Sequence, residues 1–131
     1  MLMSLIRTFT VTVGNPGAGN RYYIDGVLQE TVNLAGGYTY KFDQSDNTNG
    51  GHPFKFSTTS NGTHSGGSEY TTGVTYNGTP GDAGAYTQIV VAASAPQLYY
   101  YCQYHSGMGG QANTEPADTW GLLQWNQNSW G

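Results

Sequence analysis

The sequence predicts an all-β protein built as one sandwich-like domain. Charged residues make up only 9% of the chain, whereas it holds 20 glycines and 11 tyrosines. This composition favours short strands and tight turns over helices. Short apolar runs recur between turn signals, and about seven or eight strands at such spacing are typical of a β-sandwich. A length of 131 residues suits a single domain with a substantial core.

Local alternation and turn dipeptides predict the first strands. Residues 8–13 alternate polar and apolar side chains, as a half-buried strand does. Residues 22–29 are predicted to form a hairpin, because Asp25-Gly26 at their centre supplies the positive φ values of a type I′ turn. Residues 31–34 and 38–42 flank a Gly-Gly dipeptide, and we expect them to form a further strand pair across that turn.

A polar loop, residues 43–51, leads into the segment His52-Pro53-Phe54-Lys55-Phe56. Pro53 disfavours helical backbone at the preceding residue and therefore keeps His52 extended. Phe54 and Phe56 alternate with a lysine, which predicts a strand with one apolar face.

The second half of the chain begins with a long polar segment. Residues 57–69 are almost all small and polar and are predicted to form a surface loop, in which His64 is expected to be a solvated side chain rather than a ligand. Further strands are predicted at residues 70–76, 85–91 and 97–102, separated by turn residues.

Three residues at the end of the last predicted strand and in the segment that follows it carry the chemistry of a metal site. Cys102, the only cysteine, is followed at intervals of three by His105 and Met108. Thiolate, imidazole and thioether are the ligands that copper prefers, and a second imidazole completes a His₂Cys site with a weak axial methionine. His52, arriving from a separate strand, is the candidate. The alternative is a small buried cysteine, a loop histidine and a packing methionine.

The pattern Cys-x₂-His-x₂-Met after an aromatic strand, with a lone upstream histidine, resembles the cupredoxins, the blue-copper proteins. The resemblance covers residues 8–112 and depends on His52, Cys102, His105 and Met108. It implies a Greek-key β-sandwich with a mononuclear type 1 copper site at one end.

A narrower resemblance is to cupredoxin-like modules in structural proteins of marine phages, cyanophages especially. It is carried by residues 51–60, by 69–74 and by Tyr99-Tyr100-Tyr101-Cys102. It implies a non-enzymatic virion structural protein, either a capsid decoration protein or a tail component. Its partners would be other virion proteins, it would form a homo-oligomer, and it would be located in the virion. The alternative is a type 1 copper protein that transfers single electrons and is periplasmic.

Composition argues against several other classes of function. A net charge of −4 gives no basic surface for nucleic acid or for adsorption to an anionic membrane. A single cysteine excludes an internal disulfide. The N-terminal residues lack the pattern of a signal peptide, and no stretch is long and apolar enough to span a bilayer. Because no nucleophile triad, phosphate loop or Cys-x₂-Cys site is found, we expect no enzymatic activity.

The C-terminal segment differs from the rest of the chain. We divide the sequence into a sandwich domain, residues 1–112, and a Gly/Asn/Trp-rich tail, residues 113–131. The tail holds all three tryptophans, at five-residue intervals that match neither a strand nor a helix. We expect the tryptophans to bind a partner, because tryptophan is enriched among the residues that dominate interface energy. They are Trp120, Trp125 and Trp130. The alternative is a flexible terminal segment that binds nothing.

Overall fold

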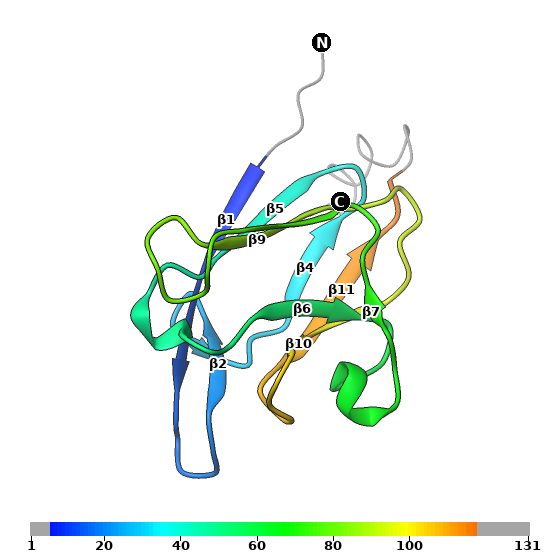
Figure 1. Cartoon of the computed structure of the whole chain (residues 1–131). Coiled ribbons are helices and arrows are strands. Elements are labelled where there is room, and N and C mark those ends of the chain that lie inside the picture. Colours follow the sequence, from blue (N-terminus) through cyan, green and yellow to red (C-terminus); the bar gives the residue numbers. More distant parts are fainter. Residues whose placement is uncertain (1–5, 118–131) are drawn as a thin grey trace.

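The computed structural model describes residues 6–117, and within them the chain is almost entirely strands and turns. Two 3₁₀ turns, η1 and η2, interrupt the strands (Figure 1). No helix in the described part of the chain is long and apolar enough to cross a membrane. The elements are β1 (Ile6–Gly14), β2 (Arg21–Ile24), β3 (Val27–Leu28), β4 (Val32–Ala35), β5 (Thr39–Asp43), η1 (Asn47–Asn49), β6 (Phe54–Ser57), η2 (Gly62–Ser65), β7 (Glu69–Tyr70), β8 (Val74–Asn77), β9 (Tyr86–Val90), β10 (Leu98–Cys102) and β11 (Gly110–Glu115).

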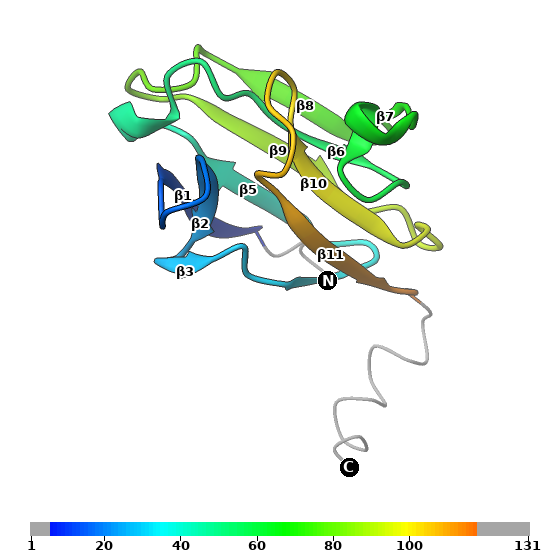
Figure 2. The same cartoon turned by 90° about the horizontal axis from the view of Figure 1, so that it is seen from below.

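The strands form two sheets that pack as a sandwich (Figure 2). A six-stranded sheet has the order β3-β2-β1-β5-β9-β8, and a five-stranded sheet has the order β4-β11-β10-β6-β7. Most neighbours are antiparallel, but β1 pairs with β5, and β11 with β4, in parallel. The predicted all-β sandwich is therefore confirmed.

Aromatic rings fill the space between the sheets. Phe54 is fully buried, with the Phe42 ring 4.7 Å away on one side and the Tyr100 ring 5.0 Å away on the other, measured between centroids. Tyr22 and Phe56 complete this cluster at 5.2 and 5.5 Å from Phe54. The prediction that β6 turns its phenylalanines to the core is confirmed, and the strand carrying them leads directly from His52.

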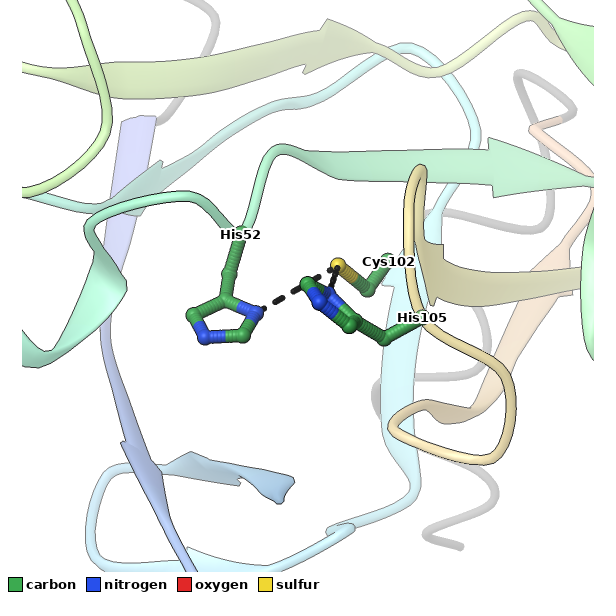
Figure 3. Close-up of side chains that lie close together, drawn as sticks. All are labelled: His52, Cys102 and His105. Carbon is green, nitrogen blue, oxygen red and sulfur yellow. Dashed lines mark hydrogen bonds between the residues drawn. The ribbon is translucent and has the colours of Figure 1, made fainter. Parts of the chain in front are cut away.

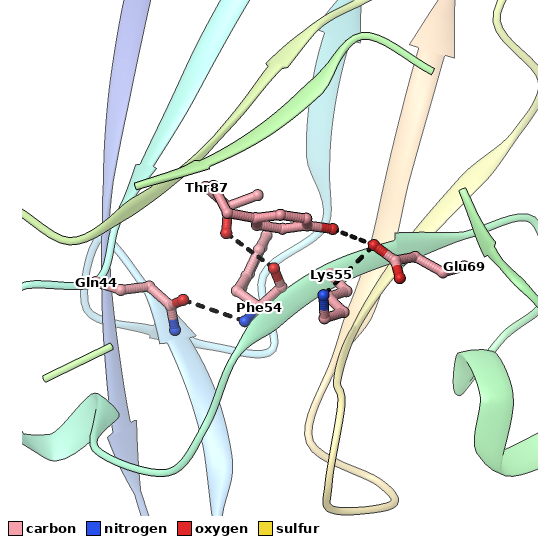
Figure 4. Close-up of polar contacts among 6 residues, drawn as sticks. Gln44, Phe54, Lys55, Glu69 and Thr87 are labelled. Carbon is pink, nitrogen blue, oxygen red and sulfur yellow. Dashed lines mark hydrogen bonds and ion pairs between the residues drawn. The ribbon is translucent and has the colours of Figure 1, made fainter. Parts of the chain in front are cut away.

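Two side chains on the side of the six-stranded sheet form hydrogen bonds with the backbone of Phe54 (Figure 4). The Phe54 amide donates to Gln44 Oε1 at 3.1 Å, and the Phe54 carbonyl accepts from Thr87 Oγ1 at 2.9 Å. Further along β6, Lys55 pairs with Glu69 at 3.4 Å. The two backbone groups of Phe54 are thus bonded to the opposite sheet, which holds the start of β6 in place beside His52.

Two strand predictions are wrong, one for a pairing and one for a continuous strand, because glycine turns carry the chain from one sheet to the other. Residues 31–34 and 38–42 form β4 and β5, but these strands do not pair with each other. Gly36 N–H donates to Glu115 of β11, whereas Gly37 N–H donates to Val91 beside β9, so the Gly-Gly turn is bonded to both sheets. The predicted strand 70–76 is likewise two strands, with Gly73 in a left-handed conformation (φ 72°) between them.

The sequence predicted no strand beyond residue 102, but β11 spans Gly110–Glu115. The predicted domain boundary between residues 112 and 113 therefore falls inside a strand. Ala112 is the one fully buried residue of β11, and its neighbours are polar. Backbone pairing with β10 and β4 holds this strand, which explains why its side chains show no hydrophobic pattern. Trp120, Trp125 and Trp130 lie outside the described residues.

Candidate metal centre

His52 is placed by the turn that connects β5 to β6. Asp46 caps η1, and the His52 amide donates to the Asn49 carbonyl at 2.8 Å. The His52 carbonyl accepts two further hydrogen bonds, from Gln44 Nε2 and from the Tyr22 hydroxyl, each at 2.7 Å. Only 8% of His52 is exposed. The backbone of His52 is therefore hydrogen-bonded at both its amide and its carbonyl, and these bonds fix the position from which its ring extends.

Buried amide side chains support this segment. Gln44 Nε2 also donates to Asn49 Oδ1 at 3.0 Å, and Asn49 Nδ2 donates to the Val11 carbonyl of β1 at 2.8 Å. Gln44 and Asn49 are 2% and 0% exposed. Buried polar groups require partners, because an unpaired one costs about 1–3 kcal/mol. This network gives them those partners and anchors the His52 segment to the six-stranded sheet.

Cys102 ends β10 on the opposite side of the site. It lies directly across the ladder from Phe54, the second residue after His52, and it is fully buried. The segment 103–109 that follows, here called the ligand loop, carries His105 and Met108. His105 is exposed, whereas Met108 is fully buried in the core cluster. The pairing of β6 with β10 therefore brings the upstream histidine to the downstream ligand loop.

The three side chains point toward one another (Figure 3). Cys102 Sγ lies 3.7 Å from His52 Nδ1 and 3.4 Å from His105 Nδ1, and all three donor atoms fall within 4.8 Å of each other. One ion about 2.3 Å from a thiolate sulfur and about 2.0–2.1 Å from an imidazole nitrogen, the zinc distances, holds these donors roughly 3.3–3.8 Å apart at ordinary bond angles. Both measured separations lie in that range.

Met108 lies on the same loop as His105, and a backbone hydrogen bond fixes its position. Its backbone carbonyl accepts a hydrogen bond from the Tyr22 amide at 2.9 Å. Tyr22 therefore contacts both ligand-bearing segments, through its amide to Met108 and through its hydroxyl to His52. The next residue, Gly109, crosses β10 so closely that a Cβ there would lie 1.8 Å from the Tyr100 carbonyl oxygen. This close approach requires glycine and returns the chain into β11.

The electrostatic environment favours neutral imidazole at the site. Burial lowers the pKa of His52 below its ordinary value, and the nearby His105 imidazole lowers it further. A metal-binding histidine must be deprotonated, so this direction suits a ligand. Burial raises the pKa of Tyr22 well above its usual range, and the adjacent Cys102 raises it further. The Tyr22 hydroxyl therefore keeps its proton and remains a donor to His52.

His64, which was predicted to be a solvated loop residue, also contacts the site. It is exposed, but its Nε2 lies 2.7 Å from the Cys102 carbonyl oxygen. Because a carbonyl can only accept, Nε2 carries the proton and donates. Its ring packs edge-on against Tyr101 at 6.1 Å between centroids. His64 therefore supports the ligand segment without belonging to the donor cluster. Its spacing in the sequence carried no signal for this contact.

Comparison with known proteins identifies the fold. No protein-family model matches the chain, and no curated protein sequence matches it either. Among solved structures, reduced rusticyanin is similar at 14% identity with a TM-score of 0.50, covering 87% of this chain and 82% of that one. Rusticyanin from Thiobacillus ferrooxidans is similar at 16% identity with a TM-score of 0.48, covering 82% and 76%. The domain is cupredoxin-like. The Greek-key β-sandwich that the first resemblance implied is confirmed.

The donor set of this cupredoxin-like domain fits a mononuclear type 1 copper ion, with two imidazoles, one thiolate and a buried methionine on the same loop. This finding overturns the virion structural function that the sequence favoured. The prediction of a capsid decoration or tail protein is wrong, and a location in the virion has no support. It was based on the lack of a signal-peptide pattern, a composition poor in charge, a tryptophan-bearing segment and the second resemblance.

Proposed function

We propose that this protein is a type 1 copper protein that carries single electrons. The observation that supports it best is the convergence of His52 Nδ1, His105 Nδ1 and Cys102 Sγ within 4.8 Å at one end of the sandwich. Met108, three residues beyond His105, would supply the weak axial thioether. Bound copper would supply one-electron redox chemistry.

The chain's own residues would perform the remaining tasks. Cys102, His52 and Met108 are buried, so three of the four donors are shielded from water. Buried donors held by the hydrogen-bonded segments around them would bind the ion without water as a ligand, which suits a carrier of single electrons. His105 is exposed and would be the donor nearest a redox partner. A transient partner, rather than a stable complex, suits this function.

The proposal assigns no enzymatic activity to the chain. A catalytic metal site keeps an open position for water or substrate. Here the clustered donors of His52, Cys102 and His105, together with Met108 from the same loop as His105, would occupy four positions of one ion. The protein would be periplasmic, as the copper-carrier alternative implied.

Copper binding tests the proposal directly. Cu(II) added to the reduced, metal-free protein should give an intense visible thiolate-to-copper band at one equivalent, and ascorbate should bleach it. Cys102→Ser should abolish the band while leaving the circular dichroism spectrum unchanged. Absence of the band in the wild-type protein, or an equal band in Cys102→Ser, would overturn the proposal.

A second variant separates loss of a ligand from loss of the fold. Since His105 is exposed, His105→Gly should open the site to solvent without disturbing the core. Added imidazole should then restore the visible band. A band that imidazole fails to restore would exclude His105 as a ligand.

A further inference from the structure

Two loop residues hold an unfavourable backbone conformation beside the ligand loop. In residues 6–117, the non-glycine residues with positive φ are Asp25 (51°), Gln29 (46°) and Asn61 (64°). Asp25 belongs to the β2–β3 hairpin turn, where this conformation is required. Gln29 and Asn61 also lie in turns, and Asn61 precedes Gly62, whose φ is positive too (53°), but the side chains of both residues reach the ligand loop. Residues in this conformation often lie at functional sites.

Both side chains bond to the same residue of the ligand loop. Asn61 Oδ1 accepts from the Gly107 amide at 2.9 Å, and Gln29 Nε2 donates to the Gly107 carbonyl at 3.1 Å. Each amide group makes a second bond nearby. Asn61 Nδ2 donates to Ser106 Oγ at 2.8 Å, and Gln29 Nε2 donates to the Gly109 carbonyl at 2.7 Å. Gly107 is thus held at both its N–H and its C=O by side chains.

The two side chains come from segments of opposite sheets, and contacts with neighbouring residues hold the backbone of each segment. Gln29 follows β3, and its amide donates to the Tyr22 carbonyl at 2.9 Å. Asn61 immediately precedes η2 in the β6–β7 connection. The adjacent Gly62 packs against Tyr101 so tightly that a Cβ would lie 2.5 Å from the ring. Side chains from both sheets therefore hydrogen-bond to the ligand loop. Gln29, Asn61 and Gly107 also help to line a surface depression of about 300 Å³.

We propose that Gln29 and Asn61 are positioning residues that fix Gly107 and thereby set the separation of His105 and Met108 before any metal binds. Gly107 is the residue immediately before Met108 and the second after His105, so its orientation governs where both side chains point. This inference rests on the proposed copper function. Partners that orient metal ligands typically contribute about 10–100-fold to metal affinity. We expect a loss of that size when either side chain is removed.

Replacing Asn61 or Gln29 with glycine tests this inference. Asn61→Gly and Gln29→Gly remove the hydrogen bonds but tolerate positive φ, so they do not add backbone strain. Asn61→Asp keeps an acceptor for the Gly107 amide and should rescue the Asn61 function. Asp25→Gly is the matched control. It also removes a side chain from a left-handed residue, but that side chain bonds to Thr10 and Arg7 rather than to the ligand loop.

Two measurements are made on each protein. In the metal-free state, hydrogen exchange of the Gly107 amide should be at least tenfold faster in Asn61→Gly than in the wild type, and unchanged in Asp25→Gly. In the copper state, both glycine variants should bind copper at least tenfold more weakly and show a changed visible spectrum, because Met108 would no longer be held in the same place relative to His105. The thermal midpoint reports any general destabilisation.

The outcomes separate this inference from the proposed function. If the wild-type protein binds no copper, the proposed function fails, while the exchange of the Gly107 amide still decides whether Asn61 orders the loop. If the wild type binds copper but Asn61→Gly and Gln29→Gly match it in affinity, spectrum and amide exchange, the positioning role is overturned. Equal losses in Asp25→Gly would also overturn it, since they would indicate a general effect of loop substitution.

Discussion

Replacing Phe54 with alanine tests whether the aromatic core is packed as the structure describes. Phe54 is fully buried, and four aromatic rings lie with centroids 4.7–5.5 Å from its own. Burial alone predicts a loss of about 3–5 kcal/mol for Phe→Ala. Aromatic pairs contribute about 0.5–1.5 kcal/mol beyond their buried area. With several such pairs lost at once, we expect a loss near the top of the range, about 4–5 kcal/mol.

Urea denaturation of the metal-free protein measures this loss. With a slope of about 2 kcal/mol per molar urea, the midpoint should fall by roughly 2 M. Phe54→Leu should lose much less, about 1.5 kcal/mol or below, because it retains most of the volume. Val90→Ala is a control for a strand residue that is 46% exposed. A loss below about 1 kcal/mol for Phe54→Ala would show that the ring does not lie at the centre of the core.

Two further predictions concern the cap before His52 and the C-terminal segment. The hydroxyl and amide of Thr48 hold the pKa of Asp46 below its usual range. The ionised Asp46 carboxylate therefore stabilises the folded protein fully above about pH 4, and this stabilisation is lost as pH falls through the folded-state pKa. The free energy of unfolding, measured by urea denaturation at a series of pH values, should therefore fall for the wild type relative to Asp46→Asn only below about pH 4. If the two proteins lose stability in parallel as the pH falls, the prediction is wrong. Ending the chain after Ala117 retains every described contact, so the melting temperature and copper band should not change, while light scattering should show loss of any self-association. Unchanged assembly would exclude the tryptophans of residues 118–131 as its cause.

The parts of the fold that the sequence predicted are those encoded by neighbouring residues. The hairpin at Asp25-Gly26 was found because both residues adopt the positive φ of its turn, 51° and 83°. The strand at Phe54 and Phe56 was found because two large apolar residues alternate within it. The donor residues were found because cysteine, histidine and methionine at this spacing are unusual outside metal sites.

The parts that were missed depend on contacts between distant residues. Nothing near β4 indicates that its partner is β11, whose pairing residues lie about 80 positions later and are mostly polar. Gln29 and Asn61 look like ordinary loop residues, and their function emerges only when Gly107 is placed between them. His64 could not be assigned for the same reason. Amide and imidazole side chains in polar loops have many partners available, and only the fold selects one.

The grouping of three donors within one short segment affects how copper would act on folding. In the unfolded chain, Cys102, His105 and Met108 remain six residues apart from first to last, and only His52 is separated from them. The unfolded chain therefore retains affinity for copper. A ligand stabilises a fold only by the difference between its affinities for the folded and unfolded states. If residues 102–108 alone bind a hundredfold more weakly than the folded site, saturating copper adds about 2.7 kcal/mol to the free energy of unfolding, however tight the folded site is.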